Sequence, residues 1–155
     1  MKKMVMVLVV LMVFGAGQVF AQQGQGFIQP TLGIGFGHTT DDIDDGGISL
    51  LMNVNFVHST GFTISAQKIL QDLSDAGMFH ESSAFGLGYT FDGGDWSAGA
   101  NLMMLSAFGD DLDLGINING TWWATETLGL TDILGFYFFD PGTFIGFWAG
   151  ISMRF

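Results

Sequence analysis

Two polar stretches of the chain carry the residue types that metal binding or catalysis would need. The first, residues 41–47 (DDIDDGG), offers several carboxylates for a divalent cation, with His38 nearby as a nitrogen ligand. A calcium loop spaces its ligands as D-x-D-x-D-G with a later glutamate, and this stretch lacks that spacing. A solvated acidic loop is the better interpretation, so we predict no metal site and no cofactor.

The second polar stretch combines a base with hydroxyl groups. His80, Glu81, Ser82 and Ser83 are consecutive, and a histidine that takes the proton of a serine is a common route to an activated nucleophile. Residues adjacent in sequence do not by that fact form a hydrogen-bonded pair. We therefore predict that the protein is not an enzyme, and this stretch leaves catalysis as an alternative only.

The charge of the chain excludes other kinds of function. The formal net charge is −11, and a nucleic-acid-binding protein needs a basic patch, so we predict no nucleic-acid partner. There is no cysteine, which excludes both disulfides and a lipid-modified cysteine. Any attachment to a membrane must therefore come from the fold itself.

The N-terminus has the pattern of an export signal. Lys2 and Lys3 precede an unbroken apolar run over residues 4–14, and small or aliphatic residues at Val19 and Ala21 suit a cleavage after Ala21. The apolar run is shorter than the roughly 20 residues that a spanning helix needs. We predict a cleavable signal peptide over 1–21 and one domain over 22–155.

The rest of the chain alternates with a period of two residues. In the last twelve residues (FIGFWAGISMRF), Ile145, Phe147, Ala149, Ile151, Met153 and Phe155 are all apolar. Strict alternation is typical of a strand whose two faces meet different surroundings. The same pattern predicts eight strands, with a longer loop over 72–82 and a turn over 125–131. The predicted strands are 27–38, 48–58, 62–71, 83–91, 96–108, 112–123, 132–139 and 144–155.

The two faces of these predicted strands differ in an informative way. One face is apolar, the other is neutral and polar, and most of the acids fall in or beside the turns. A soluble barrel needs charges on its outside, whereas lipid outside and a filled lumen inside fit the pattern. We predict an all-β, transmembrane, antiparallel up-and-down barrel. Its lumen residues are predicted to include Asn53, Asn55, Asn101, Asn117, Asn119, Trp148 and Arg154.

Two charged residues conflict with an apolar outer face. Lys68 falls on it by parity, where a lysine costs about 2–4 kcal/mol at the bilayer midplane and about 0–1 near an interface. Either the lysine extends to the interface, or a β-bulge switches the alternation there. Asp132 falls on the same face, and we expect it to lie at the rim of the barrel.

The signal, the alternating strands and the terminal aromatic residue together resemble the small eight-stranded outer-membrane barrels, the OmpA-barrel, OmpX and OmpW-like group. The resemblance implies a bacterial outer-membrane location, with outer-membrane lipid, the assembly machinery and periplasmic chaperones as partners. It implies an assembly signal at Phe155, Met153 and Ile151. Aromatic residues at strand ends then read as interfacial girdles, namely Phe62, Tyr89, Trp96 and Trp122.

Three functions remain open from the sequence. The first is a structural or surface-exposed barrel, because an eight-stranded barrel is just narrow enough for side chains to fill. The second is a narrow OmpW-like conduit with a small hydrophobic ligand, since many inward glycines leave space. The third is an enzyme that modifies lipids of the outer leaflet, which the resemblance suggests for His80 and Ser82.

Overall fold

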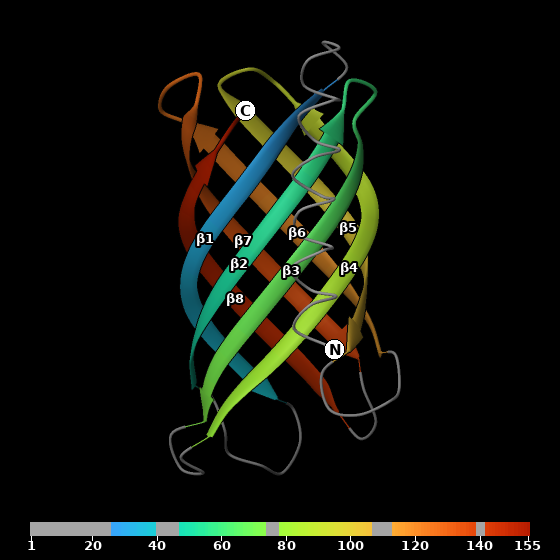
Figure 1. Ribbon diagram of the computed structural model, residues 1–155, viewed down its shortest axis with the longest axis vertical. Helices are drawn as coiled ribbons and strands as arrows, with labels where there is room; N and C mark the ends of the chain where they lie inside the picture. The colour runs from blue at the N-terminus through green and yellow to red at the C-terminus, as the bar shows by residue number, and fades with distance from the viewer. Residues whose placement is uncertain (1–25, 40–46, 74–77, 107–112, 139–141) are drawn as a thin grey trace, which may run out of the picture.

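The computed structural model describes residues 26–39, 47–73, 78–106, 113–138 and 142–155. These residues form a closed antiparallel barrel in which each strand pairs with its neighbours in sequence and β1 pairs with β8 (Figure 1). The strands are β1 Gly26–Thr39, β2 Gly47–His58, β3 Phe62–Leu73, β4 Met78–Asp92, β5 Trp96–Ser106, β6 Asp113–Trp123, β7 Leu128–Phe138 and β8 Thr143–Met153. The predicted eight-stranded up-and-down barrel is confirmed.

Short connections gather at the end of the barrel where the C-terminus lies, which we call the short-turn end (Figure 1). They are residues 59–61, 93–95 and 124–127. Two of them depend on glycine, because Gly61 has φ +89° and Gly94 has φ +87°, a region that side chains with a Cβ rarely adopt. Among the described residues, no helix is long and apolar enough to cross a membrane.

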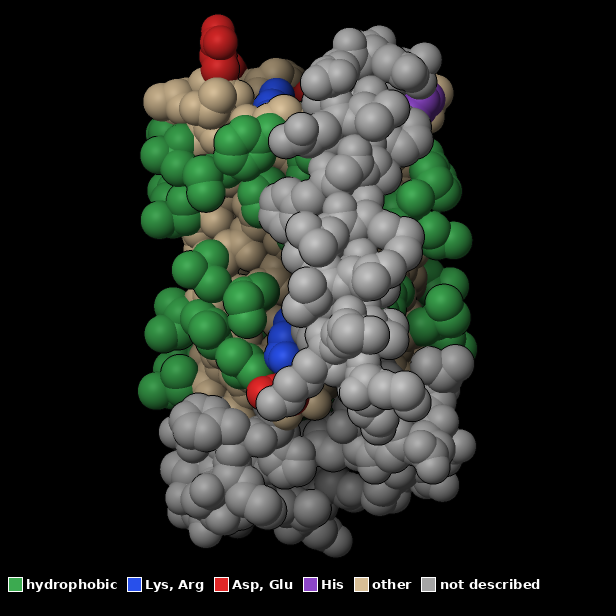
Figure 2. Space-filling model, in the orientation of Figure 1, with side chains coloured by type: hydrophobic (Ala, Val, Ile, Leu, Met, Phe, Trp, Pro, Cys, Tyr) green, Lys and Arg blue, Asp and Glu red, His purple; other side chains and the backbone are tan. Residues whose placement is uncertain are grey.

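The outer wall carries the apolar alternate residues. Ile34, Leu102 and Ile151 are 64%, 59% and 54% exposed, and Figure 2 shows hydrophobic side chains covering the strands that face the viewer. The exception is Ile28, which has outward parity yet is buried, and nothing among the described residues explains it. Large apolar residues cover the outside and many polar residues are buried inside, which is the reverse of the outer surface of a soluble barrel.

The expected loop over 72–82 is wrong, because most of it is strand. β3 continues to Leu73, and β4 begins at Met78, so that Gln71 pairs with His80 and Leu70 with Glu81. Residues 78–82 look polar in isolation, but the barrel pairs them with an existing strand. His80, Glu81 and Ser82 therefore belong to the wall of the barrel.

The expected turn over 125–131 is also wrong. The connection is short, residues 124–127, and β7 begins at Leu128. Leu128 and Leu130 are exposed while Gly129 and Thr131 are buried, so the alternation of β7 starts earlier than predicted. As a consequence Asp132 does not lie at the rim. It lies inside the strand, on the outer wall, between Gly120 of β6 and Ala149 of β8.

Lys68 lies on the outer wall without a bulge. The pairing of β3 with both neighbours runs residue for residue through Lys68, which faces Met52 and Ser83. Its Nζ donates to Oε2 of Glu81 at 2.8 Å. The lysine is therefore accommodated by an ion pair with the adjacent strand, rather than by a change of face.

Candidate functional site

The barrel interior is the region where buried polar side chains concentrate. All five predicted lumen asparagines face inward and are between 1% and 5% exposed. They are Asn53, Asn55, Asn101, Asn117 and Asn119. Buried amides need hydrogen-bond partners, and the closed ring of strands can supply them from several directions at once.

A cluster of hydroxyl groups lies in the half of the lumen nearer the short-turn end. Ser152 is its centre, with Thr31 Oγ1 at 2.6 Å and Thr131 Oγ1 at 2.5 Å from its Oγ. Thr121 lies 2.8 Å from Thr131, and Gln29 Nε2 donates to Thr121 at 2.8 Å and to Ser152 at 3.3 Å. We call Gln29, Thr31, Thr121, Thr131 and Ser152 the hydroxyl cluster. It ties together β1, β6, β7 and β8.

A second network crosses the lumen from one wall to the other. Gln67 on β3 donates through Nε2 to the Tyr137 hydroxyl on β7 at 2.6 Å. Asn117 Nδ2 donates to Gln67 Oε1, and the Tyr137 hydroxyl lies 3.4 Å from Asn117 Oδ1. Because β3 and β7 lie on opposite sides of an eight-membered ring, these bonds obstruct the middle of the barrel.

Aromatic rings occupy the lumen beyond that network. Tyr137 and Trp148 are 0% exposed and Phe144 is 6% exposed. Ring centroids are 6.0 Å apart for Tyr137–Phe144 and 6.1 Å for Phe144–Trp148, and Trp148 Nε1 donates to Ser49 Oγ. These three rings, the aromatic stack, belong to a buried apolar cluster with Leu51, Ile69, Ala84, Met103, Leu105 and Ile133.

Some of the inward glycines receive these rings rather than leaving the empty space that the sequence suggested. A Cβ on any of three glycines would collide with a ring of the aromatic stack. The pairs are Gly146 with Trp148, Gly37 with Phe144 and Gly115 with Tyr137. Large aromatic residues fit inside a narrow barrel here because the facing positions have no side chain.

Asn101 differs from the rest of the interior. Neither its amide nitrogen nor its amide oxygen has a hydrogen-bond partner among the described residues, although the residue is only 2% exposed. An unpaired buried amide costs free energy. Asn101 is therefore a buried amide whose hydrogen-bonding groups the described residues leave unsatisfied.

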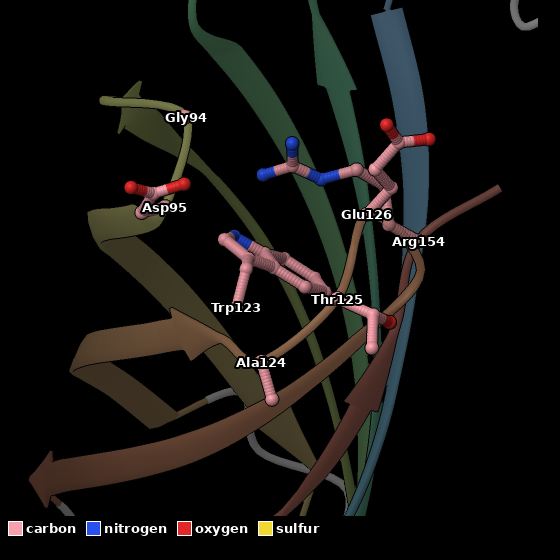
Figure 3. A pocket seen from close by; sticks show the side chains of 7 residues that line it. All are labelled: Gly94, Asp95, Trp123, Ala124, Thr125, Glu126 and Arg154. Atoms are coloured by element: carbon pink, nitrogen blue, oxygen red, sulfur yellow. The ribbon is translucent and has the colours of Figure 1, made fainter.

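Arg154 closes the mouth of the lumen at the short-turn end. Its guanidinium donates to Asp92 Oδ1 at 3.0 Å and lies 4.2 Å from the Trp123 ring centroid and 4.5 Å from that of Phe27. The contact with Trp123 borders a pocket of about 370 Å³. Figure 3 shows Arg154 extending over Trp123 toward the turn that carries Asp95.

The residues predicted to act outside the lumen face outward. Ile151, Met153 and Phe155 are between 47% and 63% exposed, and Phe155 exchanges two backbone hydrogen bonds of 3.0 Å with Ile28. The four predicted interfacial aromatics, Phe62, Tyr89, Trp96 and Trp122, are between 47% and 58% exposed. Their positions suit the predicted roles, which stay predictions.

The residues singled out for metal binding or catalysis form no site that the structure describes. Residues 41–46 lie outside the described residues, and His38 is an exposed position near the end of β1. His80 and Ser82 sit two positions apart on β4. Within the described ranges, no group of three or more histidine, aspartate or glutamate side chains could hold a metal ion.

The sequence missed the hydroxyl cluster as a unit. One of its members, Thr131, falls within the predicted turn over 125–131. The sequence does contain an indication of the cluster. Near one end of the strands that close the ring, small residues with hydroxyl groups occupy positions that face inward. The alternation tells only on which face of its strand a residue lies. The residues that it contacts across the lumen are decided when β8 pairs with β1.

No protein family model matches the chain, and no curated protein matches it in sequence. Solved structures do match in fold. Neisserial surface protein A has a TM-score of 0.57 at 12% identity, over 83% of this chain and 96% of its own. The N-terminal β-barrel domain of Pseudomonas aeruginosa OprF has 0.57 at 9% identity, over 84% and 98%. The Yersinia pestis outer-membrane protein Ail, in a phospholipid bilayer nanodisc, has 0.57 at 11%, over 84% and 100%.

These neighbours are small eight-stranded outer-membrane β-barrels, and the chain has their fold. At such low identity the likeness extends to the fold alone. It fits an integral outer-membrane protein with transmembrane strands, and agrees with the apolar outer wall.

Proposed function

We propose that the protein is an integral β-barrel of the bacterial outer membrane, structural or surface-exposed, whose side chains fill the lumen so that it does not conduct. The observation that carries this proposal is the pair of obstructions in the interior. The hydrogen bond from Gln67 Nε2 to the Tyr137 hydroxyl is 2.6 Å long and joins opposite walls of the barrel. The ring of Trp148 also lies in the lumen, where it is 0% exposed. An eight-stranded barrel is narrow enough for such residues to block it.

Planar-bilayer recording on the refolded protein tests this proposal. We expect no steady conductance steps from the wild type. The double variant Tyr137→Ala, Trp148→Ala removes both obstructions from the middle of the lumen and should be more permeable to ions than the wild type. Phe136→Ala, Phe147→Ala is the matched control, because it changes the neighbouring outward residues of the same strands. Steady steps from the wild type would contradict a filled lumen.

A narrow conduit for small hydrophobic molecules is the second candidate. It is favoured by the apolar cluster inside the barrel and by the pocket at the short-turn end, of about 370 Å³. Transport along this path would require the Arg154–Asp92 ion pair and the aromatic stack to separate. Uptake of a hydrophobic dye by vesicles containing wild-type protein, above that of empty vesicles, would favour this candidate.

We do not expect an enzyme. His80 and Ser82 lie two positions apart on a regular strand, and closeness in sequence does not by itself make a base and a nucleophile. Replacing both with alanine should leave the lipid composition of the host membrane unchanged. A lost lipid species would support the lipid-modifying alternative.

The proposed location also implies a route to the membrane. Residues 1–21 would direct export, periplasmic chaperones would hold the unfolded chain, and the assembly machinery would recognise Phe155 with Met153 and Ile151. The outward placement of these three side chains supports that role. Phe155→Ala should lower the yield of folded protein in the outer membrane, whereas the same change at Phe62 should not.

A further inference from the structure

The outer wall of β5–β8 has a row without large side chains. The strand register aligns Ala98 with Gly120, Gly120 with Asp132, and Asp132 with Ala149. All four positions are exposed. A Cβ at Gly120 would have no other atom within 4 Å, so the surface is open there.

Large apolar residues border this row on both sides. Toward the short-turn end the register aligns Trp96, Trp122, Leu130 and Ile151. Toward the opposite end it aligns Ile118, Leu134 and Phe147. The two bordering rows are four residues apart along each strand, which is about 13 Å at 3.3 Å per residue. The row with small side chains therefore lies between two rows with large ones, and we call this stretch of the outer wall the Asp132 groove.

The carboxylate of Asp132 has no partner in the described part of the protein. No hydrogen bond or ion pair involves it there, and the two described cations are engaged elsewhere. Lys68 is paired with Glu81 on β3, and Arg154 is paired with Asp92 at the mouth. An ionisable group on a membrane-facing surface is costly unless it is matched by a partner. We therefore expect a cation on another molecule to pair with the Asp132 carboxylate.

The depth of Asp132 limits what that cation can be. Leu130 pairs with Trp122, and tryptophan is typical of the membrane interface. Asp132 lies two residues farther along β7 from the short-turn end than Leu130. Two residues on a strand tilted by about 40° span roughly 5 Å of membrane depth. A lipid headgroup at the interface is within that reach.

We propose that the Asp132 groove binds a phospholipid with an ethanolamine headgroup, from the leaflet at the short-turn end. The ammonium donates hydrogen bonds to the Asp132 carboxylate, and the acyl chains lie over Gly120 and Ala149. A second copy of the chain fits less well, because a two-fold contact here would bring two carboxylates together. The inference rests on the proposed outer-membrane function.

Native mass spectrometry on the refolded full chain tests this inference. The protein is offered an equimolar mixture of phosphatidylethanolamine and phosphatidylcholine with identical acyl chains, since the trimethylated headgroup keeps the charge but has no N–H donor. We expect the ethanolamine lipid to be retained roughly 2- to 10-fold more, the range of one hydrogen bond to an exposed site. Asp132→Asn should reduce that ratio toward one, and Gly120→Leu should reduce retention of both lipids.

Glu126→Gln is the matched control, because Glu126 is an exposed acid at the same end of the barrel but outside the groove. It should keep the wild-type preference. Equal retention of the two lipids by the wild type, or a preference that survives Asp132→Asn, would overturn the inference. So would a dimer that Gly120→Leu dissociates, since the groove would then hold a second copy.

Flotation with lipid vesicles separates this inference from the proposed function. A protein that folds but does not insert into vesicles would overturn both. A protein that inserts and has no preference for ethanolamine overturns only the lipid site. Insertion followed by the expected preference supports the two together.

Discussion

The two faces of one strand meet opposite surroundings, and β8 illustrates it with adjacent residues. Phe147 is 50% exposed on the outer wall, whereas Trp148 is 0% exposed in the lumen. The inner residue contacts other side chains of its own chain and donates to Ser49. The outer residue is half covered by its own chain, and its other half meets the surroundings. Substitutions inside should therefore cost packing that nothing replaces, while lipid can fill the space left outside.

The largest effect should come from truncating the aromatic stack. We expect Trp148→Ala to lower the free energy of unfolding by about 3–5 kcal/mol, the usual cost of removing a buried tryptophan. Denaturant titration in lipid vesicles, followed by circular dichroism, measures it. Phe147→Ala is the paired control and should cost clearly less. Equal losses would mean that the two faces do not differ in packing.

The next largest loss of stability should come from placing a charge on the outer wall. Leu102 lies in the middle of β5 and is 59% exposed. Leu102→Arg should cost about 2–4 kcal/mol in vesicles, because arginine is expensive near the bilayer midplane of a barrel. The same substitution at Thr125, in a turn, is the control. If Leu102→Arg were neutral in lipid, the outer wall would not face hydrocarbon.

A smaller loss of stability is expected from breaking the hydrogen bond between Gln67 and Tyr137 across the lumen. Tyr137→Phe keeps the ring but removes the hydroxyl that accepts from Gln67. It should destabilise by about 1–3 kcal/mol, because a buried donor loses its partner. Tyr89→Phe, on the outer wall, should be close to neutral. In a double-mutant cycle with Gln67→Leu, the double variant should lose less than the sum of the two single losses, because both changes remove the same bond. Strict additivity would show that the bond does not couple the two walls.

The smallest effect should follow from weakening the Lys68–Glu81 pair. Glu81 lies near the start of β4, its side chain is 63% exposed, and a charge near the membrane interface of a barrel costs about 0–1 kcal/mol. Glu81→Gln should therefore change the free energy of unfolding by no more than that range. Lys68→Met removes the positive charge of the pair, leaves Glu81 in the wall, and should change the free energy of unfolding by no more than the same range. A large loss from either change would mean that the pair holds β3 and β4 together.

Much of the barrel was predictable because alternation reports directly on which face a residue occupies. Leu102 and Asn101 were assigned to opposite faces of β5 correctly. The predicted strand bounds were wrong at the starts of strands and where polar residues within a strand resembled those of a loop. Leu128–Thr131 contains glycine and threonine and reads as a turn, and residues 78–82 are mostly polar. Both stretches become strands because a neighbouring strand already offers its hydrogen bonds.

The interior was predictable as a list of residues but not as a set of contacts. Asn117 and Gln67 were placed inside by parity, yet nothing in the sequence indicated that they meet at the Tyr137 hydroxyl. Asp132 was expected at the rim, and the register of β7 moved it onto the wall. Asp132 keeps its outward face, but its depth depends on where β7 starts, which is at Leu128. The contact between Gln67 and Tyr137 depends on closure of the ring.

The order of residues by itself determined the strands, their two faces and the kind of surroundings each face requires, because a period of two follows from strand geometry alone. The folded barrel decided which residues meet. Gln67 and Tyr137 are 70 positions apart in the chain, and only closure of the ring through β1 and β8 brings β3 and β7 to opposite walls of a lumen narrow enough for their side chains to touch.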